Sequence, residues 1–245
     1  SIYYDFTSSW RLQVSRLLSG ETLYSDFEYP YPPLGLLITA ALFKLAGSQI
    51  LFQSLITFLV STITFVFIYK ISKLLITHKV IRTISVLTSL FLLHSLGSEI
   101  NLGGNPFPLY LGFCFFCVSA YNLLKENYIL GALFILLAAS CKHEFWLPAS
   151  IMVALSLYYT ENKVTVLLTT LGILALNFTF GYNNLDVITG LGRIEWARGQ
   201  FHWRTASVSL FLLLSTYIFK KYPILLIAVT LYTCLYVSRN LPFGI

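Results

Sequence analysis

Long apolar segments recur along almost the whole chain, and they constrain its fold more than any other feature. Hydrophobic residues make up 57% of the 245 residues and charged residues only 11%, whereas a soluble domain carries about 25% charged residues. We therefore predict an all-α, polytopic membrane protein with a single domain over 1–245 and about eight transmembrane helices. The predicted spans lie near 50–69, 82–98, 107–124, 128–141, 145–159, 164–181, 205–219 and 223–238.

The distribution of charge predicts which loops face the cytoplasm. The loop over 70–82 holds Lys70, Lys73, Lys79 and Arg82 without an acidic residue, so the positive-inside rule makes it cytoplasmic. Alternation along the chain then places further basic residues inside: Lys125, Lys163, Lys220 and Lys221. Most acidic residues fall on the outer face: Asp5, Glu21, Asp26, Glu28, Glu99, Glu144, Asp186 and Glu195. The net charge of +6 thus indicates loop orientation and contact with membrane lipids rather than nucleic acid.

The first 49 residues are expected to stay on the outer side of the membrane. Apolar residues at helical spacing between Phe6 and Leu18 predict an amphipathic helix at the membrane surface, which ends at Ser19 and Gly20. The apolar segment over 33–46 is short for a span, which needs about 20 residues. If the span over 50–69 runs from the outer side to the cytoplasm, the segment over 33–46 does not cross the membrane. We therefore expect two interfacial helices over 1–49 and a transmembrane bundle over 50–245. We also expect that a first transmembrane helix, upstream of Ser1, is missing from the sequence.

Polar residues that suit glycosyl or phosphate chemistry gather in the predicted outer segments, and we expect these segments to converge. The candidates are Asp5, Arg11, Asp26, Glu28, Glu99, Asn105, Lys142, His143, Glu144, Arg193, Arg198, His202 and Arg204. Charged groups at membrane depth are costly, which favours a functional role, and arginine binds phosphate through paired hydrogen bonds.

Two of these candidates also have a purely structural interpretation. Asp5 is well placed to cap the interfacial helix that follows it. Lys142 lies in a short turn between two apolar segments, where its ammonium group can extend to the lipid headgroups. From residue type alone, the helix cap is the stronger interpretation of Asp5, whereas the two interpretations of Lys142 carry equal weight.

No cofactor, metal or disulfide is expected. The pair Asp26 and Glu28 offers only two carboxylates, too few to predict a metal site, and no glycine-rich phosphate loop is present. The cysteines lie in or at the end of apolar segments without nearby ligands, which favours packing over a disulfide: Cys114, Cys117, Cys141 and Cys234.

The order of several motifs resembles the membrane-embedded GT-C glycosyltransferases that use polyprenyl-phosphate sugars, in particular protein O-mannosyltransferases and lipid A aminoarabinose transferases. An outer acidic residue, Asp5, precedes the stretches "LLSGETLY" and "YPYPPLGLLITAALFKLAG". The stretches "EINLGGNPFPLYLGF" and "GALFILLAASCKHEFWLP" follow. The likeness covers roughly residues 1–160 and implies a GT-C-like bundle with outer-face interfacial helices.

The resemblance implies inverting transfer of a sugar from a polyprenyl-phosphate donor to the hydroxyl of a lipid, glycan or protein acceptor. Asp5 would be the general base. Asn105 stands where many members carry a second Asp, and Glu99, six residues earlier, is the candidate substitute for that Asp. Lys142, His143 and the arginines Arg193, Arg198 and Arg204 would hold the donor phosphate. Arg11, Asp26, Glu28, Tyr31, Glu144 and His202 would line the cavity. Tyr31 stands where some members carry Lys. The expected location is a bacterial or archaeal plasma membrane, with the active site facing outward.

Two other functions stay open at this point. An O-antigen-type polymerase or ligase also uses lipid-linked sugars and outer-loop arginines, although the early Asp and the Pro-Pro-Leu segment do not define that class. A transporter or flippase would place charges near the membrane midplane, where His94 is the strongly ionisable candidate inside a predicted span.

Overall fold

The computed structural model describes residues 12–27, 29, 31–46, 50–87, 106–142 and 145–179. The helices with named bounds are α2 (Leu34–Ala46), α3 (Ile50–Leu75), α5 (Pro106–Leu124), α6 (Tyr128–Cys141), α7 (Trp146–Tyr159) and α8 (Lys163–Thr179). Helical residues also cover 12–18 and 79–87. In this part of the chain the β-structure is limited to an isolated bridge between Leu23 and Phe27, which confirms the predicted all-α class.

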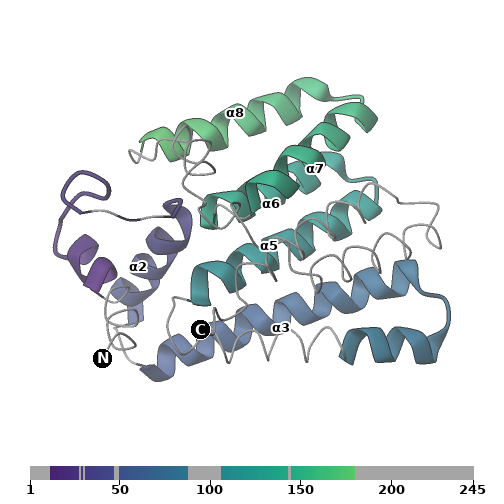
Figure 1. The fold of residues 1–245 in the computed structure, drawn as a ribbon, viewed down its shortest axis with the longest axis horizontal. Helices are drawn as coiled ribbons and strands as arrows, with labels where there is room; N and C mark the ends of the chain where they lie inside the picture. The colour runs from purple at the N-terminus through teal and green to yellow at the C-terminus, as the bar shows by residue number, and fades with distance from the viewer. Residues whose placement is uncertain are drawn as a thin grey trace, which may run out of the picture.

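Helices α3, α5, α6, α7 and α8 form the body of the bundle, and α2 lies beside one end of it (Figure 1). Consecutive helices joined by short turns alternate in direction, because short connections make neighbours antiparallel. The Ser119 hydroxyl on α5 donates to the Gly131 carbonyl on α6 over 2.6 Å. The Asn177 amide on α8 donates to the Ser140 hydroxyl on α6 over 3.1 Å. Leu34 and Ile38 of α2 pack in one cluster with Phe107 at the start of α5 and Cys141 at the end of α6. The start of α5 and the ends of α6 and α8 therefore lie at the end of the bundle that α2 covers.

Helix α2 packs on both of its apolar faces. Leu36, Ala40 and Phe43 are buried against residues of the preceding segment, including Val14 and Tyr29. On the other face, three apolar residues of α2 pack beside the start of α5 and the first half of α3: Leu34, Ile38 and Leu42. Helix α2 therefore joins the segment over 12–31 to the end of the bundle.

Gly35 allows α2 to approach α5 closely. A Cβ atom on Gly35 would lie 2.6 Å from the Cβ of Pro108, and the proline ring has little freedom to move away. We expect Gly35→Ala to destabilise the protein by about 1–3 kcal/mol through overpacking. Thermal unfolding of the purified protein in nanodiscs measures this effect.

Gly172 on α8 supplies the matched control for Gly35→Ala. A Cβ at Gly172 would meet nothing within 4 Å, so Gly172→Ala should stabilise the helix by up to about 1 kcal/mol. Equal melting temperatures for the two variants would contradict the close approach of α2 and α5.

The bundle core combines small and aromatic residues. Ala132, Ile135, Phe145 and Met152 are fully buried where α5, α6 and α7 meet. A Cβ on Gly112 would lie 2.6 Å from the ring of Phe145, so α5 approaches this ring at a glycine. Small residues and polar contacts between helices are typical of packing inside a membrane, where helices gain little from the hydrophobic effect.

Most predicted helices lie close to where the sequence placed them, but the prediction of about eight transmembrane spans is not supported. In the described part of the chain one helix, Leu55–Leu75, is long and apolar enough to cross a membrane, with a mean hydropathy of 1.9. Five shorter apolar helices lie at Leu34–Leu45, Tyr110–Leu124, Tyr128–Cys141, Pro148–Tyr159 and Lys163–Thr179. Polar turns end α6 and α7 after 14 residues each, about 21 Å at the helical rise of about 1.5 Å per residue.

Two of the predicted spans, 205–219 and 223–238, lie outside the described residues, as does most of 82–98. Helix α3 is longer than the span predicted over 50–69 and includes Lys70 and Lys73. The sequence placed the end of this helix at the first lysine, whereas the helix continues because neither lysine interrupts helical structure.

Candidate functional site

Three of the predicted site residues fall in the described part of the chain: Asp26, Tyr31 and Lys142. The other predicted site residues lie outside it: Asp5, Arg11, Glu28, Glu99, Asn105, His143, Glu144, Arg193, Arg198, His202 and Arg204. The geometry of the site is therefore built on the segment over 12–31 and on the turn that follows α6.

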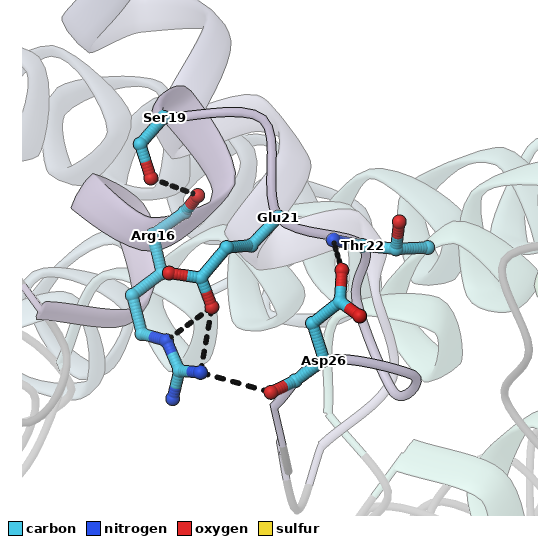
Figure 2. A network of polar contacts seen from close by, with 5 residues as sticks. All are labelled: Arg16, Ser19, Glu21, Thr22 and Asp26. Atoms are coloured by element: carbon cyan, nitrogen blue, oxygen red, sulfur yellow. Dashed lines mark hydrogen bonds and ion pairs between the residues drawn. The ribbon is translucent and has the colours of Figure 1, made fainter.

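A network of polar contacts folds the loop after the helix over 12–18 (Figure 2). The helix ends at Gly20, whose φ of 98° suits glycine, as the sequence predicted. Arg16 forms an ion pair of 2.6 Å with Glu21 and donates from Nη2 to the carbonyl of Asp26 over 2.8 Å. The guanidinium carbon of Arg16 also lies 4.9 Å from the centre of the Phe27 ring. Arg16 thus ties the two ends of the loop together.

Asp26 helps to close this loop. Its carboxylate accepts a hydrogen bond from the backbone N–H of Thr22 over 2.6 Å, and its own N–H donates to the Thr22 carbonyl over 2.9 Å. Such a turn is a common local role for aspartate. Within the described residues, no group of three or more His, Cys, Asp or Glu side chains is arranged to hold a metal ion.

Three tyrosines pack together at the Pro-Pro-Leu segment. The Tyr24 hydroxyl donates to the carbonyl of Tyr31, and Tyr24 adopts a left-handed φ of 64°. The ring of Tyr29 lies 5.6 Å from that of Tyr31, edge to face, and 6.4 Å from that of Tyr24. Edge-to-face pairs of this kind contribute about 0.5–1.5 kcal/mol beyond their buried area. The loop therefore holds the Tyr31 backbone and ring in a defined position.

Tyr29 is the most buried of the three, with 6% of its surface exposed. Its hydroxyl has no hydrogen-bond partner among the described residues. Burial raises the pKa of the phenol, and the nearby Tyr31 and Cys141 side chains add to this effect. The hydroxyl thus stays protonated and able to donate a hydrogen bond. A buried hydroxyl without a partner costs about 1–3 kcal/mol.

Lys142 meets the Pro-Pro-Leu segment across a long separation in sequence. Its ammonium nitrogen lies 5.1 Å from the centre of the Tyr31 ring, so two of the predicted site residues come together. Lys142 directly follows α6 in extended conformation, with its N–H bonded to the carbonyl of Ala138 over 3.2 Å. A cation at this position also interacts favourably with the helix dipole, and its contact with an aromatic face contributes about 0.5–2 kcal/mol.

Basic residues gather at the opposite end of the bundle. The ammonium of Lys70 lies 5.1 Å from the Phe67 ring and 5.5 Å from the Tyr121 ring, which joins the end of α3 to the end of α5. The basic residues described at this end are Lys70, Lys73, Lys79, Arg82, Lys125 and Lys163. The charge pattern that predicted cytoplasmic loops therefore maps to one end of the bundle, and the contact of Tyr31 with Lys142 maps to the other.

Sequence reasoning missed Arg16 and Tyr29 as members of this region. For Arg16, the signal that could have found it is Glu21, an acidic residue five positions later. Tyr29 opens the Pro-Pro-Leu stretch, but its burial could not be predicted because it depends on α2 and on Cys141 at the end of α6. Cys114, Cys117 and Cys141 are free and buried, as their apolar neighbours predicted.

The chain was compared with protein-family models, with curated proteins and with solved structures, and none of these comparisons found a match.

Proposed function

We propose that this chain is a membrane-embedded glycosyltransferase of the GT-C type, which transfers a sugar from a polyprenyl-phosphate donor to the hydroxyl of an acceptor on the outer face of a membrane. The single observation that carries the proposal is the contact between Lys142 and the Tyr31 ring, 5.1 Å apart. It joins two motifs of the family resemblance, the Pro-Pro-Leu segment and the stretch that contains Lys142.

Exposed apolar residues support a location in the membrane. In the most apolar window of α3, only 11% of the residues are buried, whereas the core helix of a soluble protein would be mostly buried. Large exposed hydrophobic residues continue over neighbouring segments: Leu55, Phe58, Leu59, Ile63, Val66, Val80, Ile81, Ile84, Leu87, Val164, Leu167, Leu168 and Leu171. A surface of this kind is unfavourable in water and favourable in lipid.

The separation of charge between the two ends of the bundle supports a site that faces the outer side of the membrane. Exposed lysines at the end distant from α2 suit the cytoplasmic face, which favours an outer position for the end with Tyr31 and Lys142. The loop over 19–31 and helix α2 cover this end (Figure 1), where an outer interfacial layer is expected. A donor whose lipid chain lies in the bilayer would present its phosphate at this level.

The reaction needs a base on one side of the sugar and positive charge on the other. Asp5 removes the proton of the acceptor hydroxyl, whose oxygen attacks the anomeric carbon opposite the phosphate. The bond between the anomeric carbon and the phosphate oxygen then breaks, so the configuration inverts. Lys142 stabilises the negative charge that develops on the leaving lipid phosphate, together with Arg193, Arg198 and Arg204. His143 and Glu144 orient these cations, and Glu99 and Asn105 position the acceptor.

A transfer assay tests this proposal. The full chain in nanodiscs is incubated with a panel of radiolabelled polyprenyl-phosphate monosaccharides and, in parallel, with nucleotide sugars. We expect consumption of at least one lipid-linked donor and none of the nucleotide sugars. A folded protein that consumes no lipid-linked donor would contradict the proposed function.

A further inference from the structure

We propose that the Tyr29 hydroxyl donates a hydrogen bond to an oxygen of the phosphate group whose charge Lys142 balances. The inference rests on the proposed function for its ligand class, a phosphate ester, and it adds to the site a residue to which the family resemblance assigned no role. Its starting point is the buried side chain of Tyr29, whose hydroxyl has no partner among the described residues.

The packing role of Tyr29 does not need the hydroxyl group. The ring lies in an apolar cluster with Val14, Leu36 and Phe43, and a phenylalanine ring would fill the same volume. A hydroxyl at this position therefore costs stability unless an acceptor reaches it. Natural proteins accept such a cost at functional sites.

The surroundings of the hydroxyl indicate what kind of acceptor it receives. The Tyr29 ring touches the Tyr31 ring at 5.6 Å, and the Tyr31 ring lies 5.1 Å from the Lys142 ammonium. Cys141, which precedes Lys142, is close enough to affect the ionisation of Tyr29. Tyr29 thus supplies a neutral donor, and the Tyr31 ring lies between it and the cationic donor Lys142. A neutral and a cationic donor in one region suit an oxyanion with several acceptor oxygens.

The ligand has to reach a hydroxyl that solvent does not reach. Tyr31 contacts Tyr29, Lys142 contacts Tyr31, and the side chains of Tyr31 and Lys142 are half-buried. When an anion draws the Lys142 ammonium away from the Tyr31 ring, a charge-assisted hydrogen bond forms in place of that cation–π contact. Binding of the phosphate therefore opens the path to the Tyr29 hydroxyl.

Tyr29→Phe in the full chain tests this inference, since the variant removes one oxygen and keeps the ring. Tyr121→Phe is the matched control, because Tyr121 is a half-buried tyrosine at the opposite end with ring contacts to Phe67 and Lys70. Equilibrium binding in nanodiscs is measured with three probes: undecaprenyl phosphate, undecaprenol and inorganic phosphate. Melting temperature is measured without a probe.

We expect Tyr29→Phe to weaken binding of undecaprenyl phosphate about tenfold, to leave undecaprenol binding unchanged, and to melt at the same temperature as wild type or higher. Tyr121→Phe should leave undecaprenyl phosphate binding unchanged. Binding of inorganic phosphate with the same dependence on Tyr29 would support the site and identify free phosphate as its ligand. Unchanged affinity of Tyr29→Phe for both phosphate probes would overturn the inference. A lower melting temperature, together with an equal loss of affinity for undecaprenyl phosphate and for undecaprenol, would overturn it as well.

These measurements need no sugar transfer, so the two proposals can fail separately. Phosphate binding that depends on Tyr29, without transfer of any sugar, would contradict only the proposed function. Sugar transfer with phosphate binding that does not depend on Tyr29 would contradict only the role of this hydroxyl.

Discussion

Asp5→Asn is expected to abolish sugar transfer while leaving the chain folded. The amide is almost the same size as the carboxylate, but it cannot accept the proton of the acceptor hydroxyl. Loss of a general base lowers the rate by about 10²–10⁴-fold. Initial rates with the lipid-linked donor that wild type consumes measure this effect, and the melting temperature reports on folding.

Glu161→Gln supplies the control for Asp5→Asn, because Glu161 is an exposed carboxylate between α7 and α8 at the opposite end of the bundle. We expect its rate to match wild type. A turnover near that of wild type in Asp5→Asn would eliminate Asp5 as the base. A lower melting temperature with a nearly normal rate would assign to Asp5 the helix-capping role that its position before the interfacial helix also allows.

Lys142→Met is expected to lower kcat by about 100-fold. Methionine keeps much of the length and apolar character of the side chain but removes the charge that stabilises the leaving phosphate. Removal of one group that stabilises developing charge costs about 10²–10³ in kcat. Steady-state rates over a range of donor concentrations separate this effect from a change in KM.

Lys125→Met is the matched control for Lys142→Met, since Lys125 is an exposed lysine just after the end of α5, at the basic end of the bundle. Its kinetics should match wild type. Lys142→Arg should recover part of the lost rate because it restores the charge. If Lys142→Met instead lowers the melting temperature and leaves kcat intact, Lys142 serves only to complete α6 and contact Tyr31.

The helical segments could be predicted from the sequence because local signals define them. The glycine at position 20 ended the first described helix, and the Pro-Pro pair opened α2 where the Pro-Pro-Leu segment predicted a short helix. Helix α3 continues past the span predicted over 50–69, because lysine is a good helix former and does not end a helix. About eight spans are not supported in the described residues, because hydropathy marks apolar segments without fixing their helical length.

Contacts between distant segments were harder to predict. The charge pattern correctly separated the basic end of the bundle from the end with Lys142. It did not show that Lys142 lies on the Tyr31 ring, since that depends on α2 packing against α5 through Gly35. The resemblance implied that Asp26 lines the cavity, and the sequence did not indicate that its carboxylate also accepts a hydrogen bond from the Thr22 backbone. The burial of Tyr29 follows from the same packing of α2 and α6.

The most direct test of the central claim is to locate the donor on the protein. A photoreactive undecaprenyl-phosphate sugar is crosslinked to the full chain in nanodiscs, with excess unlabelled donor as competitor, and the labelled peptides are identified by mass spectrometry. We predict labels that the competitor removes within 24–34 and 138–146, where Tyr31 and Lys142 meet. Labels confined to 70–82 would contradict the account. Labels confined to the middle of α3 and α5 would contradict it too, because a transport site at the membrane midplane would give that pattern.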